Sequence, residues 1–245
     1  MNSPSILILG ARSDIAMAIA HRFARDGYNI FLASRKSKTL DVDRVDIELR
    51  YGVVVNTYEF DALNILTHEL FLDSLPNLPN VAVCAIGCMG IQSDSQKNID
   101  AAIKVLRTNF EGPLSIISHL ANRFEAAASG TIVGISSVAG ERGRAKNYIY
   151  GSAKAGFTSF LSGLRNRLSQ DGVHIITVLP GFVFTKMTNN LNLPAKLTAQ
   201  PKELADAVFR AVQKRKNIIY VRPIWLIIMI IIRNIPEWIF KNMKI

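Results

Sequence analysis

Two side chains four positions apart could together move a proton. Tyr150 and Lys154 fall in a segment that is predicted to be helical, so they share one face of the helix. An ammonium group beside a phenol stabilises the phenolate and lowers the pKa of the phenol toward working pH. Tyr150 is therefore a candidate general acid or base. Ser137, at the end of a predicted strand, could hydrogen-bond a substrate carbonyl oxygen and polarise the carbonyl group.

The first strand-to-helix turn could hold a phosphate group. Residues 10–16 read Gly-Ala-Arg-Ser-Asp-Ile-Ala and follow the apolar run 6–9 directly. A glycine turn at a helix N-terminus directs backbone N–H groups and the helix dipole at a phosphate. An ordinary strand-to-helix turn is the alternative, although a cation in this turn favours the phosphate. The candidate phosphate-binding residues are Gly10, Arg12, Ser13, Asp14 and Ile15.

The end of the second predicted strand favours NADP over NAD. A carboxylate there would bind the ribose hydroxyl groups of NAD, but the chain has Arg35 and Lys36 instead. Together with Arg12, these cations could bind the 2′-phosphate of NADP, whereas a solvated basic loop is the alternative. Asp61, just after the third predicted strand, could cap the next helix or accept from the adenine amino group.

Apolar strands alternate with helices along most of the chain. Strands are predicted over 6–9, 29–33, 53–60, 81–85, 131–135, 173–179 and 217–221, and helices over 14–26, 98–125, 147–170 and 201–216. Strands that are apolar on both faces imply a parallel sheet covered on both sides. We therefore predict an α/β fold with one Rossmann-type doubly wound parallel sheet of about seven strands. Such sheets bind ligands at the carboxyl ends of their strands, where Gly10 and Ser137 stand.

This combination resembles the short-chain dehydrogenase/reductase family over nearly the whole chain. The resemblance is carried by the glycine turn, by residues 134–140 (Gly-Ile-Ser-Ser-Val-Ala-Gly) and by Tyr150-x-x-x-Lys154. It implies an NAD(P)-dependent oxidoreductase, a homo-oligomer, in which Ser137, Tyr150 and Lys154 are catalytic and Asn109 holds a proton-relay water. It also implies cofactor contacts at Ala85, Gly87, Tyr150, Lys154, Pro180, Gly181, Val183 and Thr185. The family's usual glycines are replaced at Asp14 and Ala16, and its Asn-Asn-Ala-Gly is replaced by Cys-Ala-Ile-Gly at 84–87.

A basic loop and residues near the C-terminus resemble one particular group of reductases within this family. Arg142 and Arg144 lie between Ser137 and Tyr150 and would suit a phosphate-bearing substrate; a solvated basic loop is the alternative. This loop and residues 233–240 resemble the reductase subunits of decaprenylphosphoryl-β-D-ribose 2′-epimerase. That resemblance implies reduction of a 2-keto-pentofuranose on a polyprenyl phosphate, the second step of a ribose-to-arabinose epimerisation for cell-envelope polysaccharide, with a flavin-dependent oxidase as partner. A reductase of another lipid-borne or apolar ketone (3-ketoacyl or sterol type) is the alternative, and a non-catalytic, cofactor-sensing protein that docks on membranes is a more remote one.

The amino-acid composition excludes several classes of protein. The 245 residues are 49% hydrophobic and 20% charged, which argues against disorder. Two cysteines exclude a disulfide scaffold and suit a reducing compartment, and the scattered histidines predict no metal site. The chain opens on an apolar strand without the features of a signal peptide, so we expect a cytoplasmic protein.

Residues 214–245 carry more than half of the net charge of +10. We expect a reductase domain over 1–222 and an apolar and basic tail over 223–245. The apolar run 224–232 is too short to span a bilayer as a helix. It could be a buried element or an oligomer contact. Alternatively it could lie on the inner face of the plasma membrane, with Trp225 and Trp238 near the headgroups. Basic flanks around an apolar run suit a membrane surface better than a nucleic acid, so no nucleic-acid partner is expected.

Overall fold

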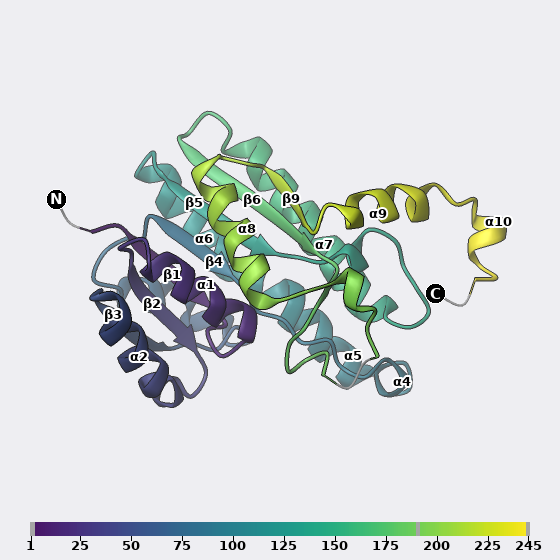
Figure 1. Cartoon of the computed structure of the whole chain (residues 1–245), viewed down its shortest axis with the longest axis horizontal. Coiled ribbons are helices and arrows are strands. Elements are labelled where there is room, and N and C mark those ends of the chain that lie inside the picture. The colour runs from purple at the N-terminus through teal and green to yellow at the C-terminus, as the bar shows by residue number, and fades with distance from the viewer. Residues whose placement is uncertain (1–2, 190–191, 244–245) are drawn as a thin grey trace.

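Seven parallel strands form the central sheet of the computed structural model, which describes residues 3–189 and 192–243. They are β1 (Ser5–Leu9), β2 (Asn29–Ser34), β3 (Val55–Glu59), β4 (Val81–Cys84), β5 (Gly130–Ile135), β6 (Val173–Pro180) and β9 (Ile218–Val221). Their order is β3-β2-β1-β4-β5-β6-β9, and every pair is parallel (Figure 1). The order reverses beside β1, which is where sheets of this kind bind ligands. The predicted fold class is confirmed.

Side-chain alternation along β1 explains why helices cover both faces of the sheet. Ile6 and Ile8 point into one core, which they share with α1 (Asp14–Ala24), α2 (Asp41–Tyr51) and α8 (Pro201–Gln213). Leu7 and Leu9 point into the other core, with α3 (His68–Asp73), α6 (Gly112–Ala126) and α7 (Tyr148–Arg167). The whole of β1 is buried, as its continuous apolar sequence predicts.

One predicted helix is divided by a wider turn. The segment predicted as helical over 98–125 forms α5 (Ile99–Leu106), a π-helical turn η3 (Arg107–Glu111) and α6. Asn98 caps α5, because its side chain accepts from the backbone N–H groups of Asp100 and Ala101. Asn109 lies within the π turn, is 0% exposed and donates to the carbonyl oxygen of Val105 over 2.8 Å. A π turn of this kind often marks a functional position in a helix.

The remaining elements are short, except at the C-terminal end. They are η1 (Ser37–Leu40), η2 (Ile65–Thr67), α4 (Gln92–Ser95), η4 (Val138–Gly140), β7 (Phe182–Val183), η5 (Ala195–Leu197), β8 (Thr198–Ala199), α9 (Ile224–Asn234) and α10 (Glu237–Phe240). β7 pairs with β8 in a separate two-stranded sheet. Figure 1 shows α9 and α10 projecting beyond one end of the central sheet. Within the described ranges, no helix is long and apolar enough to cross a bilayer.

Candidate active site

Ser137 and Tyr150 are brought together because η4 packs directly on the start of α7. Two glycines permit this close approach. A Cβ atom on Gly140 would lie 2.6 Å from the backbone nitrogen of Ala155, and one on Gly151 would lie 2.8 Å from the carbonyl oxygen of Ala139. Ser137 caps η4, since its Oγ accepts from the backbone N–H of Ala139 over 3.1 Å. The segment over 134–140 and the Tyr-x-x-x-Lys helix therefore form one packed unit.

The glycine contact gives a direct prediction. Replacing Gly140 with alanine should move α7 relative to Ser137, because the new Cβ would meet backbone atoms of Lys154 and Ala155 that cannot rotate away. We expect the free energy of unfolding to fall by about 1–3 kcal/mol, with a loss of turnover. Urea unfolding of Gly163→Ala is the matched control, because a Cβ on that glycine of α7 would meet nothing within 4 Å. Equal stability of the two variants would contradict the proposed packing.

Lys154 is a buried cation at the centre of this unit. Its side chain is 3% exposed, and its Nζ donates to the carbonyl oxygen of Ile135 over 3.0 Å. The Nζ atom lies 5.8 Å from the ring centre of Tyr150. Ser136 fixes the backbone of the lysine, because its Oγ donates to the Lys154 carbonyl oxygen over 3.1 Å. Burial lowers the pKa of Lys154 to about 8.

The pKa of Tyr150 differs from the sequence-based expectation. Burial raises the pKa of Tyr150 to about 12, and a hydrogen bond with Ser137 only partly offsets this effect. We expected the ammonium group of Lys154 to lower this pKa. That expectation was wrong for the structure, because the ammonium group donates to the Ile135 carbonyl and the phenol is desolvated. The phenol is protonated at neutral pH, as an ordinary phenol also is, so it can serve as a proton donor once the substrate oxygen gains negative charge.

Asn109 and Gly87 lie on the same side of the site as Lys154. A Cβ on Gly87 would lie 3.2 Å from Asn109 Oδ1 and 3.7 Å from Lys154 Nζ. Asn109 holds the irregular segment that follows β4, since its Nδ2 donates to the Cys88 carbonyl over 2.7 Å and its Oδ1 accepts from the Cys88 N–H. Sequence reasoning missed Cys88, which lies close enough to Tyr150 to influence its pKa.

The predicted phosphate turn has open donors at the N-terminus of α1. Gly10 adopts a φ of +85°, and a Cβ there would lie 3.1 Å from the backbone of Ala85. Ser13 caps α1 by accepting from the N–H of Ala16. Among the described residues, no acceptor is found for the backbone N–H groups of Arg12, Asp14 and Ile15. Donors in this position suit an anion.

Asp14 has a different contact from the one expected. Its Oδ2 accepts from the backbone N–H of Lys186 over 2.7 Å, and its other oxygen lies 3.7 Å from Lys186 Nζ. The carboxylate therefore fastens the loop after β7 to the N-terminus of α1. Thr185, the neighbouring candidate, donates its backbone N–H to the hydroxyl oxygen of Thr188 over 3.0 Å. The two threonine hydroxyl groups also form a hydrogen bond, over 3.3 Å.

The loop after β2 is organised by a carboxylate that the sequence analysis did not single out. Glu59, at the end of β3, accepts from the backbone N–H groups of Lys36 and Ser37 over 2.7 and 2.8 Å. These bonds lower the pKa of Glu59 and occupy both of its oxygens. Arg35 is exposed and has no ion-pair partner in the described part of the chain. Asp61 accepts from the N–H of Leu63 over 3.0 Å, so it forms a local turn.

The predicted nicotinamide loop packs against the C-terminal segment. Pro180 ends β6 and Val183 is buried in β7. A Cβ on Gly181 would lie 1.8 Å from the ring of Trp225, so only glycine fits there. Of the two alternatives for this residue, the structure supports the buried element and excludes a place for Trp225 near lipid headgroups. Its ring is 4% exposed, and its Nε1 donates to the Leu197 carbonyl over 3.0 Å.

Arg142 is not placed to bind a substrate phosphate, which corrects the sequence-based prediction. Its guanidinium donates to the carbonyl oxygens of Ile232, Arg233 and Ile235 over 2.6–3.0 Å. It also pairs with the Glu237 carboxylate over 2.8 Å. These carbonyls end helix α9, so Arg142 satisfies acceptors that the helix itself cannot. Arg144 differs, because its buried Nε has no partner within the described residues and burial lowers its pKa.

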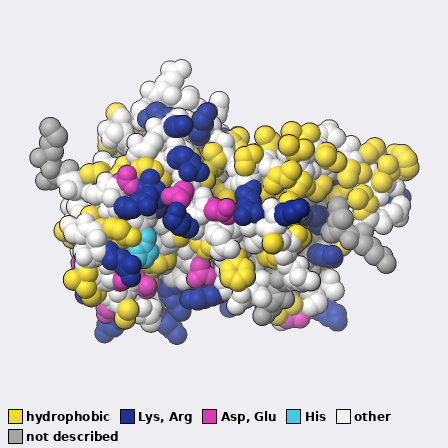
Figure 2. Space-filling view, in the orientation of Figure 1, with side chains coloured by type: hydrophobic (Ala, Val, Ile, Leu, Met, Phe, Trp, Pro, Cys, Tyr) yellow, Lys and Arg dark blue, Asp and Glu magenta, His cyan; other side chains and the backbone are white. Residues whose placement is uncertain are grey.

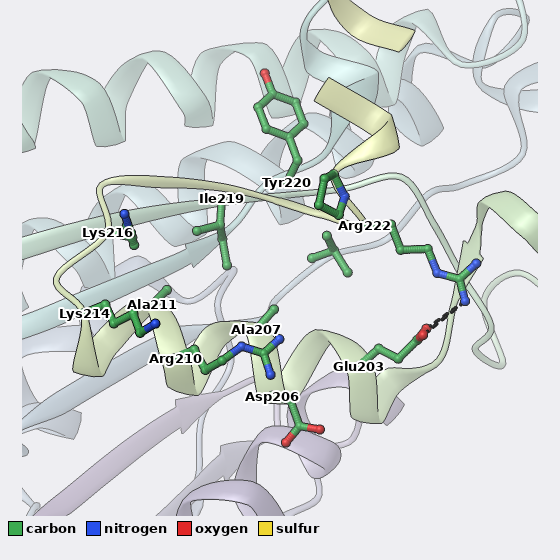
Figure 3. Close-up of a pocket in the computed structure, with 12 residues that line it drawn as sticks. Glu203, Asp206, Ala207, Arg210, Ala211, Lys214, Lys216, Ile219, Tyr220 and Arg222 are labelled. Carbon is green, nitrogen blue, oxygen red and sulfur yellow. Dashed lines mark hydrogen bonds and ion pairs between the residues drawn. The ribbon is translucent and has the colours of Figure 1, made fainter. Parts of the chain in front are cut away.

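A separate cleft lies on the other face of the sheet. An open cleft of about 520 Å³ lies between α8 and β9, and none of the predicted site residues lines it (Figure 3). Its carboxylates are already bound, because Glu203 pairs with Arg222 and Asp206 pairs with Lys202. The ring of Tyr220 points away from Arg210 and Lys214 in Figure 3, and its hydroxyl group donates to Glu141. The cleft is thus distinct from the unit around Tyr150.

Known proteins share both the sequence pattern and the fold. A family model described as short chain dehydrogenase matches residues 4–196. An uncharacterized oxidoreductase of Mycobacterium tuberculosis (strain H37Rv) is 33% identical over 241 residues, covering 97% of this chain and 96% of that protein. An uncharacterized oxidoreductase of Streptomyces coelicolor is 30% identical over 244 residues, covering 98% and 96%. The solved structure of a short-chain dehydrogenase from Sphingobium yanoikuyae in complex with NADPH has a TM-score of 0.81 at 23% identity, covering 96% and 97%.

Proposed function

The chain belongs to the short-chain dehydrogenase family of oxidoreductases, and we propose that it reduces a ketone with Tyr150 as the proton donor. The observation that carries this proposal is the packed unit of Ser137, Tyr150 and Lys154 at the carboxyl end of β5. In the proposed reaction, Ser137 holds the substrate oxygen and Tyr150 gives its phenolic proton to that oxygen. The phenol is protonated at neutral pH, so its proton is available for transfer to the substrate oxygen.

The residues around Gly10 fit a nicotinamide dinucleotide. The N–H groups of Arg12, Asp14 and Ile15 provide donors for the pyrophosphate. A bound nicotinamide would supply the hydride that reduces the carbonyl carbon. We propose that Lys154 binds the nicotinamide ribose, that Asn109 holds a proton-relay water, and that the backbone after β4, with Ala85 and Gly87, lies beside the cofactor. Further proposed contacts are made by Pro180, Gly181, Val183 and Thr185.

NADP(H) is the proposed preferred cofactor, with NAD(H) as the alternative. The Glu59 carboxylate is occupied by backbone N–H groups and is not offered to ribose hydroxyl groups. Arg12 and Arg35 are exposed cations without an ion pair among the described residues. Both features support recognition of a 2′-phosphate.

Replacing Arg35 with alanine tests this preference. We expect the KM for NADPH to rise about tenfold while the KM for NADH changes little, because a charge-assisted hydrogen bond to the phosphate is lost. Steady-state kinetics with both cofactors measure the ratio. Lys38→Ala, at another exposed cation of the same loop, is the control. An equal rise for both cofactors would refute 2′-phosphate recognition by Arg35.

We propose a keto sugar on a polyprenyl phosphate as the substrate. Support comes from the resemblance of residues 141–156 and 233–240 to reductases of such sugars. It also comes from Arg144, whose buried Nε lacks a partner among the described residues. Such a substrate implies a flavin-dependent oxidase that supplies the 2-keto sugar, and peripheral contact between the tail and the membrane that holds the lipid. We also propose that the chain works as a homo-oligomer.

Oxidation of NADPH with detergent-dispersed polyprenyl-phospho-2-keto-pentofuranose tests the substrate directly. We expect turnover that Arg144→Met reduces mainly through the KM for the lipid-linked sugar. A 3-ketoacyl thioester and a keto steroid are the comparison substrates. Turnover of either comparison substrate without turnover of the sugar would replace the proposed substrate and leave the reductase intact.

A further inference from the structure

The inner face of the C-terminal tail, defined here as residues 223–243, touches both segments that frame the reaction centre. Trp225 and Met229 are buried in a small core with Leu179 and Val138, the residue that follows Ser137. Trp225 also packs on Gly181 and meets the ring of Phe182 edge-on, with ring centres 5.1 Å apart. The tail therefore packs against the segment that carries Ser137 and against the predicted nicotinamide loop.

Arg142 fastens the loop before Tyr150 to the far end of the tail. Besides its bonds to the carbonyls that end α9, its guanidinium lies 3.8 Å from the ring centre of Phe240 in α10. Its side chain is only 14% exposed. Glu141 adds a second tie, since its Oε1 accepts from the Tyr220 hydroxyl and from Arg233 over 2.7 and 3.3 Å. Arg142 and Glu141, two adjacent loop residues, therefore both form ion pairs with residues of the tail.

The outer face of the tail is apolar and has no partner within the described chain. Figure 2 shows hydrophobic side chains gathered over the projecting end that carries α9 and α10. The exposed residues there are Ile224, Leu226, Ile227, Ile230, Ile231, Trp238, Ile239 and Met243. Because the opposite face of α9 is already buried, this face cannot turn inward to join the core.

The charges around this apolar face favour an anionic surface as its occupant. The tail carries Arg233, whose side chain is 56% exposed although it pairs with Glu141, and the exposed Lys241, which has no ion pair among the described residues. Its acid, Glu237, is bound by Arg142. If two copies of this chain met through this face, their cations would repel each other. Anionic lipid headgroups would instead attract these cations. Helix α9 has 11 residues, which are too few to span a bilayer, so contact with a membrane would run along the surface of the helix.

We propose that the tail docks on an anionic bilayer through this outer face, and that Arg142 is a positioning residue through which the docked tail holds the loop before Tyr150. The proposal deepens the proposed function, because it says how a site for a lipid-linked substrate is kept in place at the surface where that lipid lies. The tail contacts that carry it are independent of the identity of the sugar.

Flotation with vesicles tests the docking face. The wild-type chain should float with mixed phosphatidylcholine–phosphatidylglycerol vesicles, and Ile227→Gln/Ile231→Gln should reduce the bound fraction about tenfold. Leu66→Gln/Leu70→Gln is the matched control, since it also removes two exposed apolar side chains four positions apart. Absence of flotation, or equal loss in both variants, would overturn the docking. A change of sedimentation from oligomer to monomer in the tail variant alone would instead assign the face to a second copy.

Limited trypsin digestion tests the positioning role of Arg142. Cleavage after the exposed Lys146 should be about tenfold faster in Arg142→Met, because the loop is released from the tail. Arg142→Lys should restore part of the protection, and Arg50→Met, which breaks an exposed ion pair in α2, should change nothing. Anionic vesicles should slow this cleavage in the wild-type chain only.

The outcomes separate this inference from the proposed substrate. Unchanged cleavage in Arg142→Met, or vesicles that fail to protect the wild-type loop, would overturn the positioning role. A chain that floats and shows vesicle protection, but does not reduce the lipid-linked keto sugar, would keep this inference and remove the proposed substrate.

Discussion

Replacing Tyr150 with phenylalanine is expected to lower kcat by about 10²–10⁴-fold, the usual contribution of a positioned general acid. The change removes one oxygen atom and keeps the ring, so the packing of α7 on η4 should persist. Binding of NADPH, measured by fluorescence titration, should change by less than about twofold, because the phenol is proposed to act on the substrate oxygen. The measurement is single-turnover reduction at saturating NADPH.

The control lies on the same helix. Tyr148→Phe removes the same atom two residues earlier, from a side chain that is 43% exposed, and should keep wild-type turnover. Residual activity of Tyr150→Phe within a factor of about ten of the wild type would refute Tyr150 as the proton donor. Loss of NADPH binding in parallel with turnover would point instead to a structural role for the phenol.

The fold could be predicted from the sequence because most of its strands are apolar runs, which are buried on both faces in the middle of the sheet and only partly buried at its edges, β3 and β9. Each of the seven strands of the central sheet was located from such runs, and β1 was predicted to within one residue. Helices α2 and α3 were not predicted. Only Ile47 is buried in α2, and its surface includes exposed Val42 and Leu49, so its apolar pattern gives no clear stripe. α3 has just six residues, which is too short for a periodic signal.

The site was predictable where local spacing decides the geometry and unpredictable where distant segments meet. Tyr150 and Lys154 share a helix, and Ser137 follows a strand, so their meeting could be anticipated. The bonds of Arg142 reach residues 90 to 95 positions away, and no local pattern signals them. Glu59 was missed for the same reason, because its partners lie 22 and 23 positions earlier in the chain.

The role of a charged side chain also depends on its burial and its partners, which sequence patterns do not reveal. Lys154 was predicted to lower the pKa of the phenol and to bind the cofactor, yet its side chain donates a hydrogen bond to a backbone carbonyl in the structure. Arg142 and Arg144 looked equivalent in sequence. One of them is saturated by four acceptors, while the other keeps a buried Nε without a partner in the described residues. The first is a structural tie and the second remains a proposed phosphate ligand.

Replacing Lys154 with methionine should abolish activity while making the folded chain more stable at neutral pH. Burial lowers the pKa of Lys154 from 10.5 to about 8, so its charged form costs free energy in the folded state. Methionine fills a similar volume without that charge. The Ile135 carbonyl loses its donor, which costs about 1 kcal/mol. We expect a net gain of about 1–2 kcal/mol in the free energy of unfolding at pH 7, and a fall of at least about 10²-fold in kcat.

The pH dependence of stability separates this cause from better packing. Between pH 8 and pH 10 the unfolded wild-type chain holds a proton on Lys154 that the folded chain has released. Stability rises with pH wherever the unfolded state binds more protons, so the wild type should gain about 2 kcal/mol over this range relative to Lys154→Met. Urea unfolding at a series of pH values measures both curves, with Lys104→Met, at an exposed lysine of α5, as the control. The variant should start above the wild type at pH 7, and the wild type should close the gap by pH 10. Parallel curves would mean that Lys154 is not charged at a cost in the folded state, and that its ammonium group is solvated or paired when the protein works.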